Sequence, residues 1–184
     1  MKVFPIPPDI NKEGKVGNFQ KEICQLALKN GAEGASIIDV SKIVFNQNEL
    51  NCPQHVKSFY YPQVIYEKDP IQHILKQFQW AIVFTLDQQQ GLKRAYEITA
   101  IIESHCFYNN FHLAVGLAAG NCRDVFCSSR NECQAITVGK GCSFPMMARP
   151  SIEACNIDLE NLANQTNFSN YHPSKHYLGM IFVE

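Results

Sequence analysis

The sequence predicts an α/β or α+β fold, a single domain with a mixed central sheet flanked by helices. Segments with helical spacing of apolar residues alternate along the chain with short runs rich in β-branched and apolar residues. The chain has 184 residues, a length that normally forms one domain and buries about 70% of its extended surface. We therefore expect residues 1–184 to form one domain.

The first helix and strand are predicted from spacing and composition. Residues 18–30 carry apolar side chains at near-helical intervals, with Asn18 as a suitable N-cap and Gly31 as a stop. Residues 34–45 are rich in β-branched side chains, which favour a strand, and we expect it to break near Ser41.

The middle of the chain continues the alternation of predicted helices and strands. Residues 46–64 are polar and interrupted by prolines, which predicts an extended loop. A second helix is expected to open at Asp69 and Pro70 and to lead into a buried strand at residues 80–86. Residues 92–105 again show helical spacing.

The last third contains the most unusual segment. We expect a strand at residues 111–120, then a cysteine-rich loop at 121–150, a helix from Ser151 to about Asn164, and a final strand at 177–184. A loop of this length is uncommon in a compact domain unless it is functional or held from within. A bound metal would hold it.

Composition excludes several function classes. Sixteen basic and seventeen acidic residues give a net charge of -1, which argues against a nucleic-acid surface. We find no apolar run long enough for a signal peptide or a membrane span. These observations predict a cytoplasmic protein, in which thiols normally stay reduced.

Five of the eight cysteines lie in the segment from Cys122 to Cys155, with Cys127, Cys133 and Cys142 between them. A reducing location disfavours disulfides. Four converging thiolates can hold zinc or an iron–sulfur cluster. The short paired spacing typical of structural zinc is absent, and iron–sulfur ligation accepts wider gaps, so spacing favours the cluster but leaves zinc and ordinary buried cysteines open.

The segment after Cys142 resembles the closing motif of a family of small "predicted metal-binding proteins", found mostly in anaerobic bacteria and archaea. That family reads C-R-x-C-x-x-C, then P-C-R-x-P-x-x-A-R-P-S-x-E-A-x-G-I-D. The positions here that match are Cys122-Arg123, Phe144-Pro145, Ala148 to Ser151, Glu153-Ala154 and Ile157-Asp158. The resemblance implies metal ligation by Cys122, Cys127, Cys133 and Cys142, although the gaps after the first two are longer than in the family.

The resemblance extends upstream, so that it covers residues from about 46 to 165. The family's C-P-x-x-x-K-x-x-x-C-P-P is matched by Cys52-Pro53, Lys57 and Tyr61-Pro62, and its W-A-L-L by Trp80 to Val83. Tyr61 stands where the family has a cysteine, and a phenol cannot replace a thiolate at a soft metal. This chain is therefore similar to a divergent member in which Cys52 alone remains of the first thiol group.

A fainter similarity links residues 26–39 and 80–86 to epoxyqueuosine reductases and reductive dehalogenases. It implies a corrinoid cofactor beside iron–sulfur clusters. The two segments that carry this similarity have the pattern of an ordinary helix, turn and strands.

Three further residues are candidates for the metal site: Cys52, Cys155 and Arg149. Packing is an alternative for Cys155, and an ion pair with Glu153 is an alternative for Arg149. Cys24 and Cys106 lie in helical apolar patterns and are expected to be buried, and His172 and His176 are expected at the surface because Pro173 disfavours a helix between them.

The sequence therefore predicts a metal-binding, redox or electron-transfer protein with a [4Fe–4S] cluster on Cys122, Cys127, Cys133 and Cys142, served by a redox partner protein. The alternatives are a corrinoid-linked reductase or accessory protein, and a binding module with a structural zinc site. No nucleophile, phosphate-loop or dinucleotide motif is present, so no catalytic residue is predicted.

Overall fold

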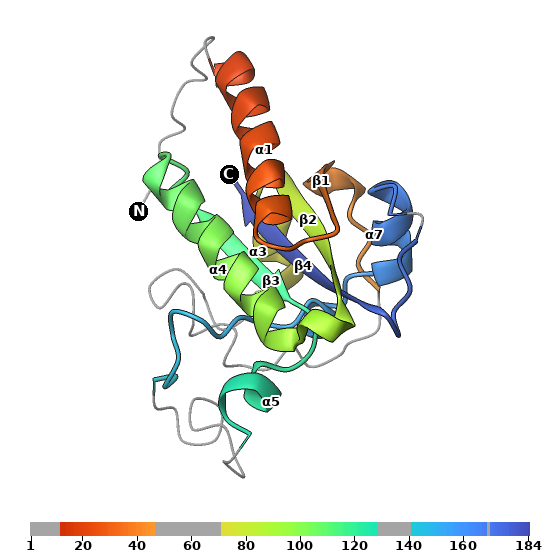
Figure 1. Ribbon diagram of the computed structural model, residues 1–184. Coiled ribbons are helices and arrows are strands. Elements are labelled where there is room, and N and C mark those ends of the chain that lie inside the picture. The colour runs from red at the N-terminus through yellow and green to blue at the C-terminus, as the bar shows by residue number, and fades with distance from the viewer. Residues whose placement is uncertain (1–11, 47–70, 129–140, 169) are drawn as a thin grey trace.

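The computed structural model describes residues 12–46, 71–128, 141–168 and 170–184. Within these ranges the centre of the molecule is a four-stranded sheet in the order β1-β2-β4-β3 (Figure 1). The strands are β1 (Gly34–Asp39), β2 (Trp80–Asp87), β3 (Ala114–Ala118) and β4 (His176–Val183).

The predicted single α+β domain is confirmed. All three strand pairings in the sheet are antiparallel, so the helix-linked parallel arrangement of an α/β fold is not what forms here. We expected a mixed sheet, but among the described residues parallel pairing is limited to an isolated bridge between Ala118 and Ser151.

Two long helices cover one face of the sheet. Figure 1 shows α1 (Lys12–Lys29) and α4 (Leu92–Tyr108) lying together against it. Side chains alternate between the two faces of a strand, and alternate residues of β2 face these helices. The β2 members of this core are Trp80, Ile82, Phe84 and Leu86.

The opposite face carries shorter elements. They are α3 (Ile71–Leu75), the 3-10 turn η3 (Glu153–Cys155) and α7 (Leu159–Gln165). Their apolar side chains pack on the other set of strand residues, and the β2 and β4 members of that core are Ala81, Val83, Leu178, Met180 and Phe182. No helix among the described residues is both long and apolar enough to cross a bilayer.

The first strand ends at a turn beside Ser41. β1 ends at Asp39, and the 3-10 turn η1 (Val40–Lys42) follows, because the Asp39 carboxylate accepts the N–H of Ser41 and turns the chain. The break expected near Ser41 is therefore found. Almost all of the loop predicted at 46–64 lies outside the described residues.

The helix predicted from Ser151 to Asn164 is wrong. Ser151 lies in the bridge to β3, and the chain turns at Asn156, whose φ of 59° is left-handed. A helix forms only from Leu159, where the Asp158 carboxylate caps a backbone N–H of the first turn. The strong local cap at Asp158 thus overrides the longer apolar pattern.

Gly179 gives a test of this core. A Cβ at Gly179 would overlap the ring of Phe84 on the neighbouring strand, so we expect Gly179→Ala to lower the free energy of unfolding by roughly 1–3 kcal/mol in urea denaturation. Gly17→Ala in α1 is the control: apart from its chain neighbours and the backbone of its own helix, no atom lies within 4 Å of its Cβ, and it should stabilise by about 0.5–1 kcal/mol. Equal effects of the two changes would contradict this description of the core.

Candidate metal centre

The structure describes three of the four predicted ligands, Cys122, Cys127 and Cys142. Cys133 and Cys52 lie outside the described residues. The proposed four-cysteine set therefore stays a prediction.

The first two of these cysteines flank a short helix, α5 (Cys122–Phe126). The Asn121 carboxamide oxygen accepts the N–H of Arg123 at 3.0 Å and starts the helix. The N–H of Cys127 donates to the carbonyl of Arg123 at 2.8 Å, just past the last helical residue. Local hydrogen bonds thus fix the backbone at both cysteines.

The sulfur of Cys142 accepts a backbone hydrogen bond. The N–H of Phe144 donates to Cys142 Sγ at 3.3 Å, and the Phe144 carbonyl in turn accepts the N–H of Ala148 at 2.8 Å. At an iron–sulfur cluster, hydrogen bonds to the ligand sulfurs adjust the reduction potential.

A row of three aromatic rings joins the elements that carry these cysteines. Phe126 at the end of α5 lies edge-on to Tyr96 of α4, with centroids 5.4 Å apart. It also stacks on Phe144 at 5.5 Å. The helix that bears Cys122 and the turn that bears Cys142 are therefore packed on each other and on the sheet-covering helix.

The surroundings of Cys122 are acidic. The Tyr96 hydroxyl donates to the carbonyl of Gly120 at 3.2 Å. Burial, followed by the neighbouring charges of Cys122, Glu153 and Asp124, raises the pKa of Tyr96, so the phenol stays neutral. A thiolate at Cys122 would add negative charge to this region, and a metal cation would offset it.

Arg149 is held in the interior by Glu103, not by Glu153. Its guanidinium pairs with the carboxylate of Glu103 on α4, and the exposed fractions of the two side chains are 8% and 11%. Glu103 also accepts the N–H of Gly116 in β3. Burial raises the pKa of Glu103, while Arg149 and the Gly116 N–H oppose the shift.

Glu153, the alternative partner, binds elsewhere. Its carboxylate accepts the N–H of Gly120 at 3.2 and 3.3 Å. The segment between Arg149 and Glu153 pairs with the edge of β3: Ala118 donates to the Pro150 carbonyl at 3.0 Å, and Ile152 donates to the Ala118 carbonyl at 3.1 Å. The chain that follows Cys142 is thus attached to the sheet.

The structure also describes Cys155, the last of the candidate ligands, together with Cys106 and the two histidines near the C-terminus. Cys155 is fully buried in the apolar core of the α7 face, where it packs. Cys106 is also fully buried, and burial followed by the charge of Glu103 raises its pKa to about 12. Of the two histidines predicted at the surface, His172 is exposed and His176 is partly buried, and the backbone N–H of His172 donates to His176 Nδ1 at 3.0 Å.

A donor set of thiolates suits a soft metal ion or an iron–sulfur cluster. Among the described residues, no three side chains of His, Cys, Asp or Glu gather as a metal site. Within the described part of the chain, Cys122, Cys127 and Cys142 are therefore not gathered as a three-ligand site.

Sequence reasoning missed two residues that organise this region, Tyr96 and Glu103. Both lie in the long apolar pattern of α4, which we read only as a core helix. The available signal was spacing: Glu103 lies seven residues after Tyr96 and four after Thr99, so all three share one face. A carboxylate on a buried helical face requires a partner.

The buried ion pair can be tested by a double-mutant cycle. We expect Arg149→Met to lower the free energy of unfolding by about 3–5 kcal/mol, because Glu103 is left buried without its counter-charge and hydrogen-bond donor. Adding Glu103→Leu should recover part of this loss, measured by urea denaturation. Strictly additive losses in the double variant would contradict a direct energetic coupling.

Comparison with known proteins agrees with the resemblance seen in the motifs. The family described as "Predicted metal-binding protein (DUF2284)" matches residues 34–183. No curated protein and no solved structure matches the chain. The match spans most of the 184 residues, and the chain therefore belongs to this predicted metal-binding protein family.

Proposed function

We propose that this protein carries a [4Fe–4S] cluster on Cys122, Cys127, Cys133 and Cys142 and transfers electrons to or from a redox partner protein. The observation that carries the proposal is the 3.3 Å hydrogen bond from the Phe144 N–H to Cys142 Sγ. Hydrogen bonds from backbone N–H groups to the ligand sulfurs are one way in which proteins set the reduction potential of an iron–sulfur cluster.

The cluster, when bound, supplies one-electron chemistry. The chain supplies the sulfur ligands and orients them. α5 fixes the backbone beside Cys122 and Cys127, and the turn that ends at Ala148 fixes Cys142. In this proposal the stacked rings of Phe126 and Phe144 keep water from one side of the cluster.

The attachment of the loop to the sheet supports this proposal as well. A site whose ligands are pre-positioned spends less binding free energy on ordering the chain. Here Arg149 and Pro150 tie the residues after Cys142 to α4 and β3. Zinc on the same thiolates would be a structural ion, so metal content decides between the two.

Metal analysis of the anaerobically purified protein tests the proposal. We expect a brown protein with a broad absorbance at about 400 nm and bound iron, and Cys142→Ser should lose most of both. Cys24→Ser is the matched control, since Cys24 lies part-buried in α1 among the core contacts of that helix, and it should keep wild-type iron. A colourless wild-type protein with stoichiometric zinc would overturn the proposal.

The aromatic row gives a second test. We expect Phe126→Ala to speed the loss of iron to a chelator by roughly tenfold, because it removes the ring between Tyr96 and Phe144 and admits water to the ligands. Phe107→Ala on the exposed end of α4 should have no such effect, since its side chain is 56% exposed. Equal rates in the two variants would contradict a shielding role for Phe126.

A further inference from the structure

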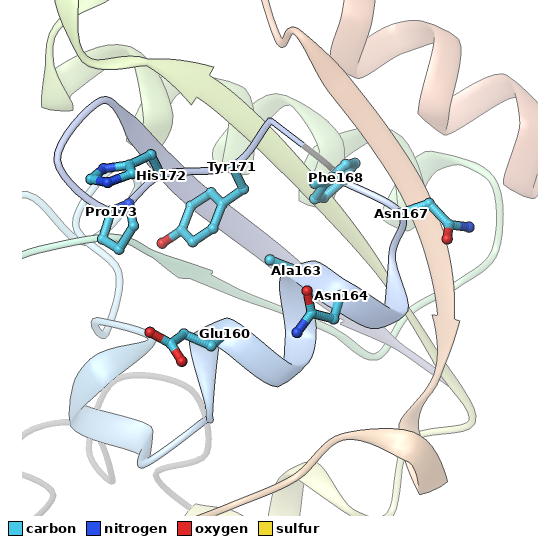
Figure 2. A pocket seen from close by; sticks show the side chains of 8 residues that line it. All are labelled: Glu160, Ala163, Asn164, Asn167, Phe168, Tyr171, His172 and Pro173. Carbon is cyan, nitrogen blue, oxygen red and sulfur yellow. The ribbon is translucent and has the colours of Figure 1, made fainter.

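A cleft lies on the α7 face of the sheet, outside the elements that carry the described cysteines. Its volume is about 810 Å³, within the range of small-ligand sites. Figure 2 shows side chains of α7 along one side and those of the chain leading into β4 along the other. The lining residues are Glu160, Ala163, Asn164, Asn167, Phe168, Tyr171, His172 and Pro173.

The α7 wall is held in place by its helix end. The N–H of Phe168 donates to the Ala163 carbonyl at 3.1 Å, and the N–H of Asn167 donates to the Asn164 carbonyl at 3.4 Å. Asn167 has a left-handed φ of 58°, as the Schellman motif requires. The Phe168 ring packs closely over Gly34 of β1: a Cβ added at Gly34 would lie 3.0 Å from Cε1 of Phe168.

The opposite wall is a hydrogen-bonded turn. Tyr171 donates its N–H to the Phe168 carbonyl at 2.9 Å, and its ring packs on the core of this face. His172 Nδ1 accepts the N–H of Ser174 at 3.2 Å and contacts the Ser174 hydroxyl at 2.7 Å.

The charge in the cleft is negative. Glu160 is the only carboxylate among the eight lining residues, and none of the eight is Lys or Arg. Burial, followed by the charges of Glu153 and Glu160, raises the pKa of Tyr171. Figure 2 shows the Tyr171 hydroxyl directed toward the side of the cleft where Glu160 lies.

We propose that this cleft binds a small organic cation, an amine or guanidinium group joined to a flat apolar group. The carboxylate of Glu160 attracts the charged nitrogen, and the side chains of Tyr171 and Phe168 line the same cleft and can contact the flat group. The amides of Asn164 and Asn167 provide further acceptors and donors at the rim. The proposed binding uses none of the residues proposed to hold the metal.

Three aromatic probes of similar size test whether the cleft prefers a positively charged ligand. Benzylamine, benzyl alcohol and benzoate differ in charge while keeping the ring. In calorimetric or NMR titrations of the full chain purified anaerobically, benzylamine should bind at least about fivefold more tightly than benzyl alcohol, and benzoate should not bind. No benzylamine binding up to about 10 mM, or equal binding of all three, would overturn the proposal.

Substitutions of cleft residues test whether the probes bind at this cleft. Glu160→Gln should remove the preference for benzylamine over benzyl alcohol, and Tyr171→Leu should weaken both while Tyr171→Phe keeps them. Glu22→Gln is the control, because that exposed carboxylate pairs with His105 on the helical face. If Glu160→Gln still binds benzylamine more tightly than benzyl alcohol, the proposal is wrong. Tighter binding of a blocked Gly-Arg-Gly peptide than of benzylamine would overturn the assignment of a small-molecule ligand.

Discussion

The buried ion pair between Glu103 and Arg149 fixes the chain after Cys142 to the body of the protein. One carboxylate serves two donors, the guanidinium and the N–H of Gly116 on the edge of β3. Both charged side chains are almost fully enclosed, so separating them would leave a charge in an apolar region at a cost of several kcal/mol. The interaction therefore determines where the closing motif can lie.

The same ion pair explains the sequence around it. A Cβ at position 116 would meet Thr99 and Glu103 closely, so glycine is required there for the carboxylate to reach the strand edge. Pro150 and Ile152 then continue the pairing at Ala118. An edge strand with its N–H and C=O groups satisfied in this way is protected from pairing with another chain, and the cysteine turn gains a rigid base.

Local patterns were enough to predict the elements of the core. The apolar spacing of α4 and the continuous apolar runs of β2 and β4 hold in the structure, because their side chains fill two well-packed faces. The helix expected from Ser151 failed because Asn156 and Asp158 impose a turn and a cap that a periodicity argument ignores. Spacing does not report such local hydrogen bonds.

The candidate site was predictable only in its chemistry. Cysteine spacing and the closing motif pointed to a metal, but the partner of Arg149 lies 46 residues away in sequence, at Glu103, and no local signal pairs the two. The role of Tyr96 likewise arises from a contact with Phe126 between separate elements. Long-range contacts of this kind are set by the packing of α4 on the sheet.

Glu153 connects the two regions for which we make proposals. Its carboxylate is held by the Gly120 N–H, and its charge acts on both Tyr96, beside Cys122, and Tyr171 in the cleft. Coulomb effects between partly buried groups are less screened than those between exposed ones. Under the proposed function, reduction would add negative charge near Cys122 and oxidation would remove it. A cation in the cleft should therefore favour the reduced state, and by reciprocity the reduced protein should bind the cation more tightly.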